Sequence, residues 1–114
     1  MPAGGTMPLH DHPGMTGLLK VLWGSVRCRS YAWVEGLPGL ARATSDCLLS
    51  PADTPRRLAP REDNLHRLDA LEDSAFLDLL APDYSEAEGR PCVYYSEAGT
   101  VAVEGGALLL LTPA

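Results

Sequence analysis

Two of the three histidines of this chain lie one residue apart, in the stretch "MPLHDHPGM" at residues 7–15. In an extended strand, residues i and i+2 point to the same face, so the imidazoles of His10 and His12 would project together while Asp11 points away. Pro13 favours this geometry, because the residue before a proline is pushed into an extended conformation. Two imidazoles on one face supply half of a transition-metal site. Taken alone, the pair also fits two polar residues in a surface loop.

The residues around the pair place it in a longer pattern. Five residues separate His10 from a preceding glycine, and Gly24 ends the apolar stretch that follows His12. This spacing resembles the first motif of the cupin barrels, in which a glutamate completes a metal site. The glutamate position falls on Gly17, so the resemblance implies a ligand set without a carboxylate. His66, in "DNLHRLDAL", lies where the second cupin motif supplies its histidine, which makes His10, His12 and His66 the expected ligands.

A narrower family fits four blocks of the chain in order. The blocks "PLHDHPGMTGLLKVLWGSV", "DNLHRLDA", "AFLDLLAPDY" and "GRPCVYY" resemble those of the 2-aminoethanethiol (cysteamine) dioxygenases and plant cysteine oxidases. The resemblance covers most of residues 4–96, with a weaker echo in "LLLLTP", and is poorest over residues 31–61. Asp83 stands where the family pattern has a second proline before Tyr84.

The resemblance implies an all-β fold, namely a cupin-type jelly-roll barrel (a double-stranded β-helix) in one thiol-dioxygenase domain over residues 1–114. Family members carry further N-terminal strands and a longer C-terminal tail, so we expect this barrel to be incomplete at the N-terminus. A barrel abolishes its strand edges only when it closes. We therefore expect the chain, expressed alone, to be weakly stable, prone to self-association and low in activity.

The implied chemistry is thiol oxidation at Fe(II) held by His10, His12 and His66. The substrates would be O2 and either cysteamine, which gives hypotaurine, or a peptide with an N-terminal cysteine, which gives its sulfinic acid. Three neutral imidazoles leave the charge of the iron uncancelled, and a positive metal favours a bound thiolate. Two alternatives remain: a three-histidine zinc site that activates water, and a partial cupin that binds metal without turnover. The chain shows no convincing general base for the zinc alternative.

Four further residues in the matched blocks are candidate site residues. Asp78 lies among apolar residues, where a carboxylate needs a partner; it could orient a ligand or a substrate amine, or be a surface acid. The family places Tyr84 near the substrate, although an aromatic residue that caps the core fits equally. Cys92 and Tyr94, spaced i and i+2, would share one face of a strand. Some thiol dioxygenases join such a pair by a thioether bond; the alternative is a buried thiol beside a core tyrosine.

Short apolar runs between glycines and prolines predict strands throughout the chain. The runs "GLLKVLWG" and "SVRCRSYAWVEG" meet at Gly24 and Ser25, which favours a hairpin. Strands are also expected in "LARATSDCLL", "NLHRLDAL", "PCVYY", "GTVAVEG" and "ALLLLTP", and a short extended piece in the proline-rich segment 50–63. The run "SAFLDLLAP" fits a helical turn or a buried strand, because periodicity does not separate them.

Composition limits the classes of partner. The chain has 114 residues, enough for one core, and a net charge of -6, which argues against nucleic acid and anionic membranes. Its longest apolar run is too short to span a bilayer, and no secretory signal is expected. Cys28, Cys47 and Cys92 form no CxxC pair and are odd in number, which favours reduced thiols in a cytoplasmic protein. We expect the folded enzyme to be a monomer.

Overall fold

The computed structural model describes all of residues 1–114 and consists almost entirely of β strands. One short 3-10 helix, η1, covers Glu86–Glu88. The strands are β1 (Thr6–Asp11), β2 (Thr16–Trp23), β3 (Val26–Trp33), β4 (Leu40–Leu49), β5 (Arg56–Leu58), β6 (Leu65–Ala70), β7 (Ala75–Ala81), β8 (Tyr95–Val103) and β9 (Gly106–Pro113).

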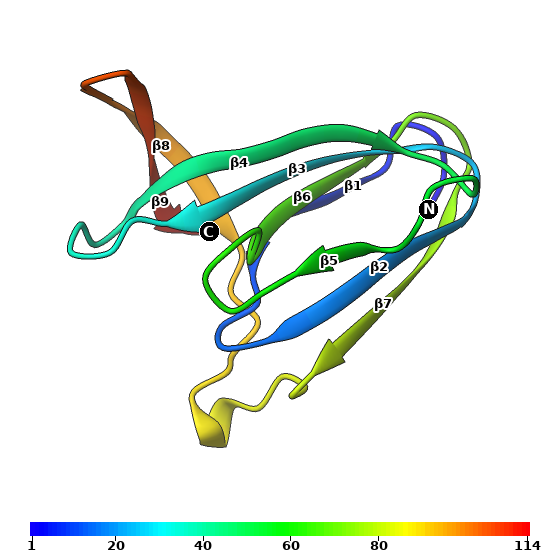
Figure 1. The fold of residues 1–114 in the computed structure, drawn as a ribbon, viewed down its shortest axis with the longest axis horizontal. Coiled ribbons are helices and arrows are strands. Elements are labelled where there is room, and N and C mark those ends of the chain that lie inside the picture. Colours follow the sequence, from blue (N-terminus) through cyan, green and yellow to red (C-terminus); the bar gives the residue numbers. More distant parts are fainter.

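The strands form two antiparallel sheets that face one another and nearly close a barrel (Figure 1). The larger sheet has six strands in the order β1-β6-β3-β4-β9-β8, and the smaller has three in the order β5-β2-β7. The β8–β9 hairpin projects beyond one end of the facing sheets. This arrangement confirms the predicted all-β, cupin-type jelly-roll barrel. The fold contains no helix long and apolar enough to span a membrane.

The core between the sheets follows from strict alternation along the strands. In β3, Val26 and Cys28 are fully buried while their neighbours are partly exposed, and in β2 the same holds for Leu19 and Val21. Residues two apart on a strand share a face, so both strands turn their apolar face inward. The main cluster comprises Leu19, Val21, Val26, Cys28, Leu49 and Leu68. Burial of these side chains holds the sheets together.

The hairpin predicted at Gly24 and Ser25 is wrong. The strands before and after this turn, β2 and β3, belong to different sheets, so they face each other across the core and do not pair. Gly24 has φ +83°, and a Cβ there would overlap Asp73 and Ser74. Ser74 also binds the crossing chain, since its Oγ accepts the amide of Ser25 at 3.0 Å. Alternating sequences look the same in a hairpin and in facing sheets, so the local pattern did not separate them.

Three other segments can be compared with what the sequence predicted for them. The run at 74–82 is a strand, β7, and the proline-rich segment contains the short extended piece β5, as expected. The strand expected in "PCVYY" is wrong, since β8 begins only at Tyr95. Val93 and Tyr94 instead make single backbone contacts with the end of β1, where Tyr94 forms an isolated bridge to His10. Strand β1 ends at Asp11, so its pairing with Val93 and Tyr94 does not extend further.

Three strands of the larger sheet converge on Asp69 in β6. Its carboxylate accepts hydrogen bonds from Thr6 Oγ1 at 2.8 Å, Arg29 Nη2 at 2.7 Å and Arg67 Nε at 3.1 Å. Burial alone would raise the pKa of Asp69, but the bonds from Arg67, Arg29 and Thr6 outweigh it and lower the pKa to about 2. The ionised carboxylate therefore ties β1 and β3 to β6. Of these strands, β1 carries the candidate ligand His10 and β6 carries His66.

Replacing Asp69 by Asn should lower the free energy of unfolding at neutral pH and have little effect in strong acid. A group whose pKa is lower in the folded state contributes stability above its unfolded pKa, and this contribution is lost as the pH falls through the folded value. The difference between variant and wild type should therefore shrink between about pH 5 and pH 2. Urea titrations over this range measure it. Asp46→Asn, which breaks an exposed pair with Arg27, is the control and should change little.

Candidate metal centre

The three histidines come together because β1 and β6 are neighbours. His10 lies directly opposite His66 in the antiparallel register of these strands. His12 follows the end of β1, and its backbone amide donates to the carbonyl of Asn64 at 2.9 Å. This bond keeps the chain extended for one more residue, so His12 returns to the face that carries His10. The structure thus unites the three ligands predicted from the sequence.

The imidazoles form a compact, buried group. Their ring centroids lie 4.7 Å apart for His10–His12, 4.7 Å for His10–His66 and 4.4 Å for His12–His66. One ring nitrogen of each residue lies within 4.8 Å of the others, and all three residues are buried. A metal ion with bonds of about 2 Å to imidazole nitrogen would fit between atoms at this spacing.

Backbone carbonyls fix which nitrogen is free in the rings of His10 and His12. The Nδ1 of His10 donates to the carbonyl of Pro8 at 2.8 Å, and the Nδ1 of His12 donates to the carbonyl of Asn64 at 2.8 Å. Because a carbonyl only accepts, both neutral rings carry their lone pair on Nε2. The Nε2 atoms of His12 and His66 are buried without a hydrogen-bond partner. Buried polar atoms without partners are destabilising, and a metal ion would satisfy them.

The electrostatics keep the three rings neutral. Burial, followed by the proximity of His12 and His10, lowers the pKa of His66 well below the ordinary value of 6.5. Burial also lowers the pKa of His10 and of His12. Neutral imidazole is the form that binds metal, so the ligand set is ready at neutral pH without loss of a proton.

Asp78 is the one predicted site residue that comes from the smaller sheet. It lies on β7 opposite Leu19 of β2, is partly buried, and its Oδ1 has no hydrogen-bond partner. Burial raises the pKa of Asp78, while the nearby ring of His10 opposes this shift. The carboxylate therefore lies close enough to the histidines to interact with them electrostatically, and it is free to accept a hydrogen bond from another molecule.

Tyr84 lies beside the histidines and contacts the backbone between them. Its hydroxyl donates to the carbonyl of Asp11 at 2.8 Å, and its ring lies 6.0 Å from that of His12. Burial, and then the neighbouring thiol of Cys92, raises the pKa of Tyr84, so the phenol stays protonated.

Cys92 and Tyr94 lie near the site, but the prediction that they share a strand is wrong. Both fall in the irregular segment before β8, and both are exposed. The thiol of Cys92 raises the pKa of Tyr94 and that of Tyr84, which places it beside both phenols. The ring of Tyr94 lies 5.5 Å from that of His10.

Two residues that support the ligands from behind were not predicted from the sequence. The carbonyl of Asn64 holds both the amide and the ring of His12, and the indole Nε1 of Trp33 donates to Asp11 Oδ2 at 3.2 Å. Burial raises the pKa of Asp11, an effect that the bond from Trp33 opposes. The position of Asn64, two residues before His66, was the available signal. No local pattern identified Trp33, because its contact joins β3 to the end of β1.

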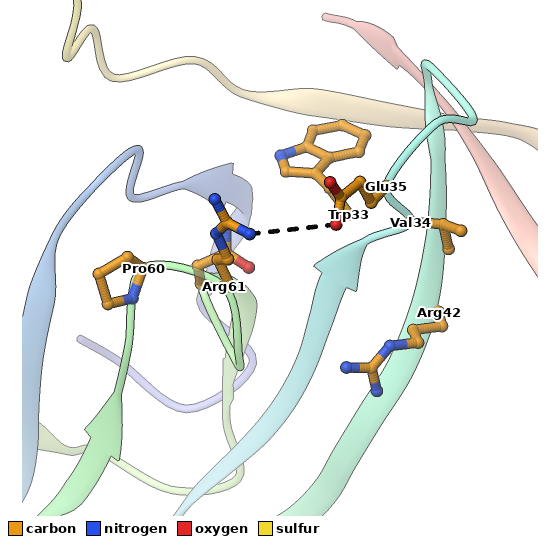
Figure 2. A pocket seen from close by; sticks show the side chains of 7 residues that line it. Trp33, Val34, Glu35, Arg42, Pro60 and Arg61 are labelled. Carbon is orange, nitrogen blue, oxygen red and sulfur yellow. Dashed lines mark ion pairs between the residues drawn. The ribbon is translucent and has the colours of Figure 1, made fainter.

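A pocket of about 500 Å³ adjoins this region and is shown in Figure 2. Its lining includes Trp33 and Asn64, the two residues that support the ligands from behind. Arg61 and Glu35 face each other across it as an exposed ion pair at 4.0 Å. The lining residues are Trp33, Val34, Glu35, Arg42, Pro60, Arg61 and Asn64.

Comparison with known proteins places this site in a family. The PCO_ADO family model matches residues 1–107. The chain belongs to this family. It is similar to the 2-aminoethanethiol dioxygenase of Homo sapiens, with 38% identity over 82% of this chain and 44% of that protein. Plant cysteine oxidase 1 of Arabidopsis thaliana is 38% identical over 85% of this chain and 36% of that protein.

A third relative is the probable 2-aminoethanethiol dioxygenase of Dictyostelium discoideum, 38% identical over 78% of this chain and 44% of that protein. The predicted family is thus confirmed. The chain spans less than half the length of each of these three relatives.

Replacing any one of His10, His12 or His66 by Ala should sharply lower the content of bound divalent metal. Each change removes one of only three ligands and leaves a cavity in its place. Metal analysis of protein purified under identical conditions measures the effect. Cys47→Ser removes a thiol outside the group and should leave the metal content unchanged. Full metal content in all three variants would show that the ligands are assigned to the wrong residues.

The glycine at position 17 gives a second test of the ligand set. Under the thiol dioxygenase activity proposed below, Gly17→Glu should lower oxidation of aminothiols, because a carboxylate would cancel part of the metal's charge and block an open coordination position. The structure adds a steric effect, since a Cβ at Gly17 would lie 2.9 Å from Leu80 Cδ2 and 3.0 Å from Leu58 Cγ. Metal binding should survive or strengthen.

Gly17→Ala separates the two effects, since it introduces the Cβ without the carboxylate. It should destabilise the chain by about 1–3 kcal/mol through overpacking, while turnover per bound metal stays close to that of the wild type. If Gly17→Glu and the wild type have equal turnover per bound metal, the argument that the carboxylate acts by cancelling the metal's charge is contradicted.

Proposed function

We propose that this chain carries the active site of a non-haem iron thiol dioxygenase. The observation that carries the proposal is the convergence of three neutral, buried imidazoles with no carboxylate among them. Such a set holds a first-row metal and leaves coordination positions open. Membership of the PCO_ADO family supports the assignment, since relatives of this chain are named as a dioxygenase and an oxidase of small thiols.

The proposed reaction converts a thiol and O2 into a sulfinic acid, with both oxygen atoms added to the sulfur. His10, His12 and His66 would hold Fe(II), and the carbonyls that accept the Nδ1 protons of His10 and His12 would keep the Nε2 atoms of these two rings available to it. When bound, the iron supplies the centre at which sulfur and O2 react, and its charge lowers the pKa of the thiol. The cysteamine product would be hypotaurine.

Asp78 would bind the amine of the substrate. Its unpartnered Oδ1 is an acceptor in a partly buried position near His10, and an ammonium group is the partner that a buried carboxylate favours most. The substrate would then be held at both ends, with its sulfur at the histidines and its nitrogen at Asp78. This arrangement limits the motion of the thiol and lowers the entropy lost in the reaction.

Tyr84, Cys92 and Tyr94 complete the proposed site. Tyr84, with its raised pKa, would act as a hydrogen-bond donor rather than as a base. The proximity of Cys92 to the tyrosines is compatible with a thioether bond between Cys92 and Tyr94, as the family resemblance implies. Mass spectrometry of the purified chain tests it, since the bond would remove two hydrogen atoms.

The substrate could be cysteamine or the N-terminal cysteine of a peptide. Both present an amine two carbons from the thiol, so the histidines and Asp78 would bind them in the same way. We propose a cytoplasmic monomer, consistent with three free cysteines, and expect neither nucleic acid nor membranes as partners.

The test is a paired assay on iron-loaded protein. Oxygen consumption and sulfinic acid are measured with cysteamine and with a short peptide that begins with cysteine, together with iron content. Iron-dependent sulfinic acid from either substrate supports the proposal, and the ratio of the two rates identifies the preferred substrate. Stoichiometric iron without product from either would leave only a metal-binding protein.

Asp78→Asn should lower kcat/KM for cysteamine about 10- to 100-fold, the equivalent of one hydrogen bond to a charged group. The change keeps the shape of the side chain and removes its charge. Ethanethiol, which lacks the amine, should react equally with variant and wild type. Asp83→Asn, an exposed neighbour, is the control. The same loss with both thiols would show that Asp78 supports the fold or the ligands rather than the amine.

A further inference from the structure

We propose that Trp33 and Asp11 form a positioning pair that holds His10 and His12 in ligand geometry from the outer face of the sheet. The inference rests on the proposed metal centre and assigns a role to two residues outside the ligand set. Neither would touch the metal or the substrate.

Asp11 is the residue between the two ligands, and its side chain points to the opposite face. The residue is buried, with only 9% of its surface exposed, yet it is a carboxylic acid. One oxygen, Oδ2, accepts the indole N–H of Trp33 at 3.2 Å, and the other, Oδ1, has no hydrogen-bond partner. Burial of a half-satisfied carboxylate is unfavourable for folding, so packing alone does not account for an acid at this position.

Trp33 reaches Asp11 from the end of β3, two strands away. In the paired register, Tyr31 lies opposite Leu65 of β6, and Leu65 lies opposite Asp11 of β1. Trp33 is two residues beyond Tyr31 on the same face, so its indole extends past the start of β6 to the end of β1. Its ring packs edge-on against that of Tyr95, with centroids 5.1 Å apart. The donor is therefore held in place by the sheet and by β8.

The backbone of Asp11 is fixed as well. Its amide donates to the carbonyl of Val93 at 3.1 Å, and its carbonyl accepts the hydroxyl of Tyr84 at 2.8 Å. With the bond from Trp33, Asp11 is held at three points. Rotation about its backbone would move the imidazoles of His10 and His12 relative to each other, so these bonds set the spacing of two ligands. Partners that hold a ligand in place typically change metal affinity 10- to 100-fold when they are mutated. The bonds to Asp11 would act on His10 and His12 through the backbone that joins them.

The test is a titration of the metal-free chain with Co(II), followed by its visible absorption, which reports ligand geometry. Trp33→Phe keeps the ring on Tyr95 but removes the N–H, and Asp11→Leu removes the acceptor. Both should weaken Co(II) binding at least about tenfold and shift the absorption bands. Asp11→Asn keeps an acceptor oxygen, so it should bind Co(II) within about threefold of the wild type, with unchanged bands, which is rescue by the conservative variant. Thermal melts of the metal-free variants record any general loss of stability.

Trp23→Phe is the matched control, because Trp23 is an exposed tryptophan on β2 outside the pair. It should leave affinity and spectrum unchanged. Wild-type affinity and spectrum in both Trp33→Phe and Asp11→Leu would overturn the pair while leaving the proposed metal centre intact. Equal loss in Asp11→Asn and Asp11→Leu would also overturn it, since charge and not the hydrogen bond would then be responsible. A wild-type chain that binds no Co(II) would overturn the metal centre and the pair together.

Discussion

The site depends on the burial of three imidazoles, each of which has a ring nitrogen within 4.8 Å of the others. Burial lowers the pKa of each ring, and neighbouring imidazoles lower the pKa of His66 and His10 further, so none is charged near neutral pH. For His10 and His12, a backbone carbonyl fixes the Nδ1 proton, which leaves Nε2 for a metal. Two unpartnered nitrogens in a buried space are unfavourable without an ion. The same features that make the metal-free site unstable therefore suit it to hold a metal ion, and the surrounding strands must hold it together.

A jelly-roll barrel meets this requirement with two sheets that make different contributions. The larger sheet supplies His10 and His66, which the register of β1 and β6 places opposite each other, and His12 follows directly after β1. The smaller sheet supplies Asp78 on β7. The carboxylate comes from the other sheet, so it remains outside the ligand set while still acting on His10 electrostatically. A single sheet could present the histidines but could not place an acid on the facing side.

The sequence predicted the parts of this structure that depend on local spacing. The apolar runs that form β2 and β3 predicted two strands, and the spacing of His10 and His12 predicted that their rings share a face. It failed where the outcome depends on which distant strand is the neighbour. Identical alternation allows β2 and β3 to pair as a hairpin or to face each other across the core. The bond from Trp33 to Asp11 depends on the register across β6, which no single segment encodes.

The separation of neutral ligands from a nearby carboxylate also bears on the choice of substrate. We propose that the two parts of the site match the two ends of an aminothiol. A metal held by neutral imidazoles keeps its full positive charge and favours a thiolate, whereas Asp78 favours an ammonium group. A thiol without the amine would leave the carboxylate of Asp78 unpaired in a partly buried position, which is unfavourable. A substrate that carries its own carboxylate near the amine would be repelled by the carboxylate of Asp78. Selectivity for the thiol-amine pair then follows from charge, before the shape of the pocket contributes.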